Sequence, residues 1–412
     1  MSDTIAGTVG PLQMAPVVEL SVVMPCLDEE DSVAECVRWA LEGIAKTGLV
    51  GEVVVCDNGS KDRSAELASA AGARVVHQPA KGYGNAYLKG FAESTGRFIV
   101  MGDSDLTYDF RRLDELIAPL VGGSADYVLG SRFAGQITPG AMTFSHRYIG
   151  NPVLTRILNL FFGLRSTDAH SGLRAFTREA FELMDLRCEG MEFASEIVIK
   201  AGQGKLRVAE VPIEYHPRVG ETKLRTFRDG WRHLRFMLLL APNWLFLYPG
   251  AFLFLMGMIG QSVLLSTTVS VAGHELNVHF SALFAMLALV GFQATVFAAF
   301  AHAWADSLGL EEPTSVATWV RDGFTLERGL LVGATFFGTG LAIDTYILVV
   351  WIAKDFGDLA ALRPALFALT LMVLGGQMAF SSFFLGLLKV KVRHRRPVAE
   401  VIYDTFTSDV VA

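Results

Sequence analysis

The hydrophobic pattern divides the chain into two parts of different character. Up to about residue 240, short apolar runs alternate with polar and amphipathic stretches; from about 243 onward, long apolar runs dominate. The short runs Leu20–Met24, Gly51–Cys56 and Phe98–Met101 predict buried strands, the first of them ending at Pro25. Strand–helix alternation with short connections predicts an α/β domain with a mostly parallel sheet.

The segments between these strands predict helices, with acidic residues where a helix N-terminus favours them. The expected helices cover residues 28–45, 63–71 and 81–94, and further strands are expected at 73–77 and 210–215. A helix at 190–200 would place Glu192 and Glu196 one turn apart, either lining a ligand pocket or forming an ordinary helix face.

The second part predicts four membrane-spanning helices. They are expected at about 243–267, 279–303, 329–353 and 364–388, each longer than the about 20 residues needed to cross a bilayer. Basic residues precede the first span and follow the last, so both places are expected in the cytoplasm. The loop at 268–278 has no Lys or Arg, whereas Lys354 and Arg363 oppose this orientation. Asp344, inside the third span, receives no role.

The expected domain organisation has five parts. They are a flexible N-terminus (1–18), an α/β domain (19–224), an amphipathic interface helix (225–242), a transmembrane domain of four helices (243–389) and a basic cytoplasmic tail (390–412). The interface helix carries one basic stripe, formed by Arg225, Arg228, Arg232 and Arg235. Such a helix is typical of a membrane surface, although it can also dock on the domain's own core. The segment 139–164 has a similar interfacial character.

Composition supports this division. Of the 412 residues 51% are hydrophobic, and the mean hydropathy of +0.39 is too high for a wholly soluble protein. A net charge of −7 argues against general nucleic-acid binding. The four cysteines show no metal or disulfide spacing and are expected to be small buried side chains in a reducing compartment; they are Cys26, Cys36, Cys56 and Cys188.

Candidate chemistry collects where the predicted strands end. Asp103 and Asp105 follow the strand 98–101, and two carboxylates there suit Mg²⁺ or Mn²⁺, unless they form only a solvated loop. Glu29 and Asp57 follow two other strands. The glycine-containing turn at 82–84 would let backbone approach a phosphate, but it matches neither a dinucleotide fingerprint nor a P-loop.

Several motifs in order carry a resemblance to a known family. They are Val22–Pro25 followed by Asp28–Glu30, then Asp57–Asp62, Lys81–Ala86 and Asp103–Asp105. Over about residues 19–240 the chain resembles the family 2 glycosyltransferases of GT-A fold. Gly130–Phe133 and Ser171–Arg174 make it most similar to the polyprenyl-phosphate sugar synthases, such as dolichyl-phosphate mannose synthase. Asn58 and Thr107 depart from the pattern, where an acid and a metal-binding Gln are common.

The resemblance implies a site for a nucleotide-sugar donor. It assigns Pro25, Glu29 and Asp57 to the base and ribose, and Lys81 and Gly84 to the vicinity of the donor. Arg218 and Lys223 would belong to a loop that closes over the donor diphosphate. Asp103 and Asp105 would hold the Mg²⁺ or Mn²⁺ that stabilises the departing nucleotide.

The resemblance also implies an acceptor site for a lipid monophosphate. Arg132 and Arg174 would supply the cations, with Ser131 and Ser171 beside them. A phosphate monoester has a second pKa of about 6, so it is largely dianionic at neutral pH and needs no strong general base.

The resulting hypothesis is an integral-membrane enzyme. It would transfer a hexose from GDP-mannose or UDP-glucose to polyprenyl phosphate, with inversion, at the cytoplasmic face. One alternative is a processive polysaccharide synthase, whose QxxRW motif is not found here. The other is a non-catalytic lipid-sugar transporter or scaffold. The oligomeric state stays open, a homo-oligomer included.

Overall fold

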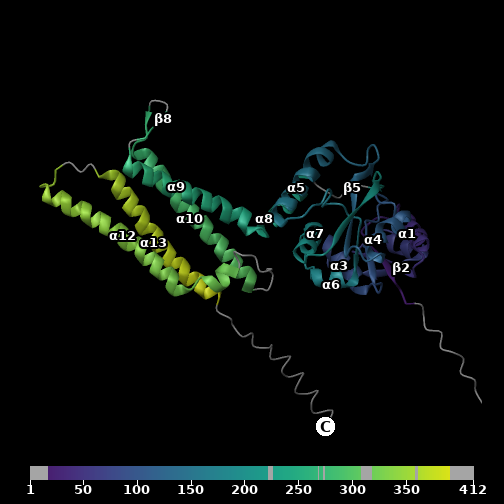
Figure 1. Ribbon diagram of the computed structural model, residues 1–412. Coiled ribbons are helices and arrows are strands. Elements are labelled where there is room, and N and C mark those ends of the chain that lie inside the picture. The colour runs from purple at the N-terminus through teal and green to yellow at the C-terminus, as the bar shows by residue number, and fades with distance from the viewer. Residues whose placement is uncertain are drawn as a thin grey trace, which may run out of the picture. The chain divides into compact units, whose positions relative to one another are not determined.

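The protein consists of two compact units, Met1–Leu240 and Ala241–Ala412, which are described separately (Figure 1). The computed structural model describes residues 17–220, 226–267, 269–271, 274–307, 318–357 and 361–389. Lys223, Arg225 and the expected tail at 390–412 therefore lie outside the described residues, as does most of the expected N-terminal segment.

The first unit is built on a seven-stranded sheet with the order β3-β2-β1-β4-β6-β5-β7. The strands are β1 (Leu20–Cys26), β2 (Gly51–Asp57), β3 (Arg74–His77), β4 (Phe98–Met101), β5 (Tyr127–Ile137), β6 (Arg174–Thr177) and β7 (Val208–Tyr215). Only β6 runs antiparallel to its neighbours β4 and β5, and all other pairs are parallel. The predicted mostly parallel α/β sheet is confirmed, with one reversed strand in it.

Helices cover both faces of this sheet (Figure 1). They are α1 (Val33–Thr47), α2 (Ser64–Ala70), α3 (Tyr83–Glu93), α4 (Leu113–Val121), α5 (Asn151–Phe162), α6 (Arg178–Met184), α7 (Phe193–Gln203) and α8 (Thr226–Leu239). Alternate strand residues point to opposite faces. Val22 of β1 accordingly packs in the core with α1 and α4, whereas its neighbour Val23 packs in the core with α3 and α7.

Two predicted boundaries at the start of the chain were wrong. β1 continues through Pro25, which pairs with Cys56 of β2. This costs little because the pairing of β1 with β4 has already ended at Val23, so no ladder hydrogen bond to β4 is lost. α1 begins at Val33 rather than at residue 28, because Asp28 adopts a left-handed conformation with φ 50°.

The basic helix α8 docks on the first unit through one face. His233 and Met237, four residues apart, are buried, and Met237 belongs to the core cluster formed with α7. Arg228, Arg235 and Trp231 are exposed. The alternative that this helix packs on the domain's own core therefore holds for its inner face, while its basic face remains outside.

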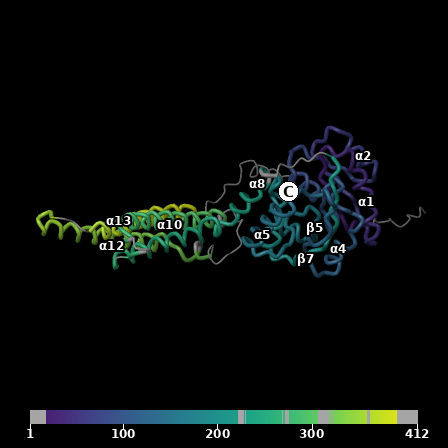
Figure 2. Tube along the Cα trace, turned by 90° about the horizontal axis from the view of Figure 1, so that it is seen from above, coloured from purple at the N-terminus to yellow at the C-terminus, as the bar shows by residue number. Residues whose placement is uncertain are grey.

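The second unit contains the four predicted long apolar helices, with ends within five residues of those expected. They are α9 (Tyr248–Ser266), α10 (Val278–Ser307), α12 (Leu326–Ala353) and α13 (Leu362–Leu388). Short elements connect them, namely η3 (Asn243–Leu247), the hairpin β8 (Ser270–Val271) and β9 (His274–Glu275), and η4 (Trp319–Gly323). By length and composition all four can cross a membrane, and Figure 2 shows them side by side.

Small residues and a few polar groups hold these helices together. Gly333 of α12 faces Gly375 of α13, where the two backbones approach closely. Gln261 of α9 donates to the carbonyl of Ser281 in α10 and to the hydroxyl of Thr370 in α13, at 3.3 and 3.1 Å. One side chain thus joins three helices.

Arg363 is a basic residue in a segment that the predicted orientation places outside the cytoplasm, and its side chain is bound within the bundle. Its guanidinium donates to the carbonyls of Leu264 and Leu276, at 3.3 and 3.0 Å. These carbonyls belong to the last turn of α9 and to the residues just before α10. The charge therefore lies against one carbonyl at the C-terminal end of α9 and one carbonyl of the connection to α10.

Adjacent glycines in α13 provide a test of the packing between α12 and α13. A Cβ at Gly375 would lie 2.5 Å from the Gly333 carbonyl oxygen, whereas one at Gly376 meets nothing within 4 Å. We expect Gly375→Ala to destabilise the protein by about 1–3 kcal/mol, because overpacking forces the backbones apart. Gly376→Ala should leave stability unchanged or slightly raised. Thermal unfolding in detergent measures both, and equal unfolding temperatures would contradict this packing.

Candidate functional site

The predicted donor residues meet at the edge of the sheet where the parallel strands end. Glu29 follows β1, Asp57 ends β2, and Asp105 follows β4. Arg218, which follows β7, binds the Glu29 carboxylate and lies 3.4 Å from Oδ2 of Asp105. One arginine therefore connects the groups predicted to bind the nucleotide with those predicted to bind the metal.

Asp103 is held by two tyrosines of α3. Its Oδ1 accepts hydrogen bonds from the hydroxyls of Tyr83 and Tyr87, at 3.1 and 3.3 Å. Burial, together with the charge of Asp105, raises the pKa of Asp103 to about 6. Burial raises the pKa of both tyrosines well above the usual value, so they remain donors.

Asp105 is oriented by Thr107, the residue that departs from the family pattern. Its Oδ1 accepts from the backbone N–H and the hydroxyl of Thr107, at 3.1 and 2.5 Å. The hydroxyl of Ser104, between the two acids, donates to the Pro25 carbonyl at 2.7 Å. Thr107 thus supports a carboxylate.

The carboxylate pair has a donor set that fits a hard divalent cation. In Asp103 and Asp105 alike, Oδ1 accepts hydrogen bonds from the tyrosines or from Thr107, and Oδ2 of Asp105 faces Arg218. Within the described part of the chain, no three His, Cys, Asp or Glu side chains form a cluster that could hold a metal. Two carboxylates suit Mg²⁺ or Mn²⁺, which keeps waters and takes its remaining ligands from substrate phosphates.

The neighbouring predicted residues surround this pair. Oδ2 of Asp57 lies 3.2 Å from Nδ1 of His77, and its Oδ1 accepts from the Ser60 N–H at 3.1 Å. Burial alone would raise the pKa of Asp57, but these hydrogen bonds hold it below its ordinary value. Asn58 accepts from the Gly82 N–H and donates to the Ala80 carbonyl, so it anchors the loop that carries the exposed Lys81.

The glycines at the start of α3 serve a contact within the protein. A Cβ at Gly84 would lie 2.0 Å from the Cys188 carbonyl oxygen, and one at Gly82 would lie 2.3 Å from that of Glu189. Buried Glu196 accepts from the N–H groups of Arg187 and Cys188, at 2.9 and 2.8 Å. Glu196 therefore anchors the loop against which α3 packs, and the role of Gly84 toward the donor stays a prediction.

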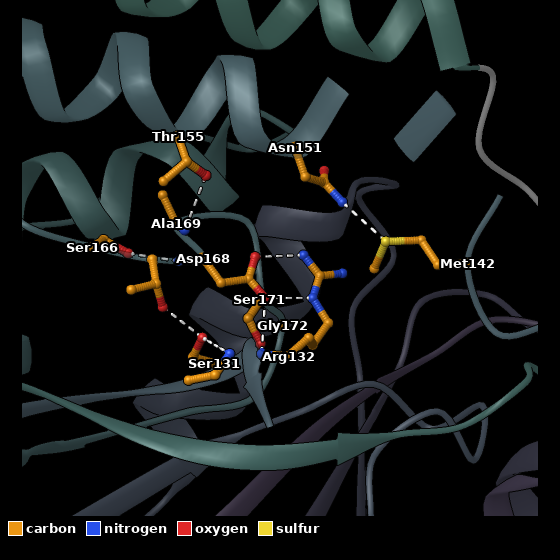
Figure 3. A network of polar contacts seen from close by, with 12 residues as sticks. Ser131, Arg132, Met142, Asn151, Thr155, Ser166, Asp168, Ala169, Ser171 and Gly172 are labelled. Carbon is orange, nitrogen blue, oxygen red and sulfur yellow. Dashed lines mark hydrogen bonds and ion pairs between the residues drawn. The ribbon is translucent and has the colours of Figure 1, made fainter. Parts of the chain in front are cut away.

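The predicted acceptor residues lie around a buried ion pair. Arg132, at 6% exposure, donates from Nε and Nη2 to the two carboxylate oxygens of Asp168, which is fully buried (Figure 3). Both distances are 2.7 Å, and the Arg132 backbone N–H donates to the same group at 3.0 Å. Asp168 thereby balances the charge of Arg132 and fixes its orientation.

Arg174 has different surroundings. It is fully buried, and its guanidinium donates to the carbonyls of Ser171, Ala169 and Ala194. Its Nη1 and the Ser171 hydroxyl are buried and have no hydrogen-bond partner among the described residues. The Ser131 hydroxyl, by contrast, contacts Thr167 Oγ1 at 2.6 Å and accepts from the Ala134 N–H. Arg174 and Ser171 therefore have bonding capacity for a ligand, whereas Arg132 and Ser131 are engaged.

Comparison with known proteins agrees with this geometry. The sequence model described as "Glycosyl transferase family 2" matches residues 21–184. The low-salt glycan biosynthesis hexosyltransferase Agl6 of Haloferax volcanii is 43% identical over 370 residues, which cover 90% of this chain and 89% of that protein. The chain belongs to glycosyltransferase family 2.

Other family members and a solved structure show more distant likeness. A dolichyl-phosphate hexose transferase of Haloferax volcanii is 32% identical over 213 residues, covering 52% of this chain and 89% of that protein. A crystal structure of glucosyl-3-phosphoglycerate synthase from Mycobacterium tuberculosis superimposes with a TM-score of 0.44 and 23% identity, over 54% of this chain and 80% of that one.

Membership extends to the second unit. Residues 299–389 match the description "Glycosyltransferase family 2 C-terminal transmembrane region". Together with the four apolar helices, this makes the chain an integral membrane protein and a glycosyltransferase of this family.

Sequence reasoning missed the supporting residues of this family 2 site. Asp168 lies three residues before Ser171 in the matched motif, and this spacing was the available signal for it. Tyr83 and Tyr87 lie four residues apart on α3, so both point to one side of the helix, but nothing in the sequence places Asp103 there. Tyr108, whose hydroxyl accepts from the Gly172 N–H at 2.7 Å, gave no signal.

The Arg132–Asp168 pair yields a stability prediction. We expect Asp168→Asn to destabilise the protein by about 3–5 kcal/mol, because it leaves a buried guanidinium without its counter-charge. Denaturant unfolding of the full chain, followed by tryptophan fluorescence, measures the change.

The matched control is Asp185→Asn, which breaks an ion pair whose side chains are both more than half exposed. Asp185 has φ 43°, a conformation that Asn tolerates, and the loss should stay below about 1 kcal/mol. Equal losses in the two variants would show that the buried pair contributes no more than an exposed one.

Proposed function

We propose that the protein transfers a hexose from a nucleotide sugar to the phosphate of a polyprenyl lipid, inverting the anomeric carbon. The observation that carries the proposal is the pairing of two sites with opposite charge. Carboxylates gather after β1, β2 and β4, and a buried arginine without a carboxylate partner in the described chain lies in the motif that ends in β6. The names of the similar proteins, a hexosyltransferase and a dolichyl-phosphate hexose transferase, support it.

The acidic site is assigned to the donor. Asp57 is a constrained, ionised acceptor that suits a ribose hydroxyl or a base N–H; Pro25 lies at the end of the adjacent strand β1 and Glu29 on the loop after it. Arg218 would leave the carboxylates of Glu29 and Asp105 and bind the donor diphosphate instead. Lys81 is assigned to the same diphosphate region, as is Lys223, which lies outside the described residues. GDP-mannose and UDP-glucose are the two candidate donors.

The site around Arg174 is assigned to the acceptor. Its Nη1 and the Ser171 hydroxyl, which have no hydrogen-bond partner among the described residues, can both donate to phosphate oxygens. Arg132 would contribute through its fixed guanidinium plane, and Ser131 would support the loop rather than touch the ligand.

The chemistry then needs little from the protein beyond positioning. A lipid phosphate oxygen attacks the anomeric carbon as the bond from that carbon to the diphosphate breaks, and the nucleoside diphosphate leaves. Mg²⁺ or Mn²⁺ on Asp103 and Asp105 would offset the charge that develops on the leaving diphosphate. Because the attacking phosphate is already ionised, no side chain has to remove a proton.

Side chains exposed on the first unit are consistent with a lipid acceptor. Phe144, Tyr148 and Leu160 in and before α5 are 72%, 59% and 58% exposed. Arg147 and Arg156 lie in the same segment, and such a mixture of aromatic and basic residues is typical of a membrane interface. We assign this surface and the ends of the bundle near residues 243 and 389 to the cytoplasmic side, since Arg363 at the opposite end is engaged with helix carbonyls.

The activity test uses the purified full chain in detergent. It is incubated with polyprenyl phosphate, Mg²⁺ or Mn²⁺ and a panel of nucleotide sugars, and the lipid fraction is analysed by mass spectrometry. We expect one donor to add one hexose to the lipid. Asp105→Asn should reduce the rate about 100-fold or more, because metal stabilisation of the leaving group is worth several kcal/mol.

Asp114→Asn, on the exposed side of α4, is the control and should keep full activity. Metal-dependent nucleotide binding without any lipid product would contradict the proposed acceptor. Full activity of Asp105→Asn would contradict the proposed metal site.

The raised pKa of Asp103 predicts the pH dependence of metal binding. Below about pH 6 a proton competes with the metal for this carboxylate, so affinity should rise with pH and level off above it. Tyr83→Phe removes a hydrogen bond that lowers the pKa of Asp103, so the midpoint should move to higher pH. Mn²⁺ titration by isothermal calorimetry from pH 5 to 8 measures this, and an unchanged midpoint would contradict it.

A further inference from the structure

His170 lies within the proposed acceptor motif, beside the residues assigned to the phosphate. It belongs to the loop between α5 and β6, two residues after Asp168 and just before Ser171. Both of its ring nitrogens are shielded from solvent and have no hydrogen-bond partner among the described residues. Each unpaired buried polar atom costs about 1–3 kcal/mol, so such an arrangement calls for an explanation.

The surroundings of the ring are cationic. Arg174 and Arg132 are the charged groups that act on it, and Asp168, the nearby acid, is already bonded to Arg132. On its other side, the ring of His233 from α8 lies nearly perpendicular, with the centroids 5.0 Å apart. Burial first, and then His233 and the two arginines, keep the pKa of His170 well below its usual value, so the ring is neutral at neutral pH.

The unpaired atoms of this stretch have one chemistry in common. His170, the Ser171 hydroxyl and Arg174 Nη1 can all donate hydrogen bonds. Within the described part of the chain, Arg174 donates to carbonyl oxygens, lies near the Tyr127 hydroxyl and has no carboxylate partner. A ligand that satisfies them must present several acceptor oxygens and negative charge. A phosphate monoester has both properties.

We propose that His170 is a further binding residue for the acceptor phosphate, donating from a ring nitrogen to a phosphate oxygen beside Ser171 and Arg174. His233 of α8 then holds the ring in place; Nδ1 of His233 lies 2.8 Å from the Ser195 hydroxyl of α7. The basic helix α8 is thereby part of the acceptor site, through its buried face. This inference rests on the proposed acceptor, and it extends that site to two histidines.

A proton would accompany the ligand. The dianion offsets the repulsion from Arg174, Arg132 and His233, so phosphate binding favours the charged imidazole. Affinity for the phosphate monoester should therefore increase as the pH falls from 8 toward 6.5, above the second pKa of the phosphate itself, which is about 6.

The test measures binding and transfer separately, on the purified full chain in detergent. Isothermal calorimetry follows farnesyl phosphate, with farnesol and inorganic phosphate as companion ligands. His170→Phe keeps a ring and removes both nitrogens, and we expect it to weaken farnesyl phosphate binding at least tenfold. Binding of UDP or GDP with Mn²⁺ should be unchanged. The matched control is His279→Phe, an exposed histidine of the second unit, which should bind like the parent.

A second variant keeps the inference falsifiable if His170→Phe fails to fold. His170→Gln retains donor and acceptor atoms but cannot take up a proton, so it should bind more weakly than the parent and lose the increase in affinity between pH 8 and 6.5. An unchanged affinity in His170→Phe, an unchanged pH profile in His170→Gln, or no binding of farnesyl phosphate to the parent would each overturn the proposal. Equally tight, His170-dependent binding of inorganic phosphate would overturn the assignment to a lipid.

The transfer assay distinguishes this inference from the function on which it rests. If farnesyl phosphate binds in a His170-dependent way but no nucleotide sugar yields a lipid-linked hexose, the proposed reaction fails and the phosphate site stands. If hexose is transferred while His170→Phe keeps the parental KM for the lipid, the reaction stands and the role of His170 fails.

Discussion

Two like charges held together at the end of β4 constrain the rest of the first unit. Asp103 and Asp105 are one residue apart, and their repulsion in a partly desolvated place must be offset by neighbours. Two tyrosines from α3, a threonine two residues on and an arginine from beyond β7 provide the offset. Segments that are distant in sequence must therefore pack around the two carboxylates even when no substrate is bound.

The arginines of the opposite motif show how burial separates two residues of the same type. Arg132 pairs with the carboxylate of Asp168, which balances its charge within the protein. This pair also holds the loop from α5 to β6. Arg174 donates to carbonyl oxygens and has no carboxylate partner among the described residues, so its charge is not balanced by an acid there. The different surroundings of the two arginines thus come from one acid, Asp168, which pairs with Arg132.

Much of this could be predicted from the sequence, because the relevant signals are local. Apolar runs placed β1, β2 and β4, and predominantly apolar spans of more than 20 residues placed all four long helices. The order of short motifs indicated the family, which the comparisons confirm. The roles of the predicted site residues stay predictions, since the structure places these residues but holds no substrate.

The sequence by itself determined the fold class, the two-part organisation and the residue types at the strand ends, since periodicity and spacing are properties of adjacent residues. Only the tertiary structure decided which of those residues are paired. Asp168 with Arg132, Arg218 with Glu29, and His170 beside His233 join positions that the chain separates by 36, 189 and 63 residues. Whether a charge is buried, and whether an opposite charge within the protein balances it, is decided only when such segments pack together.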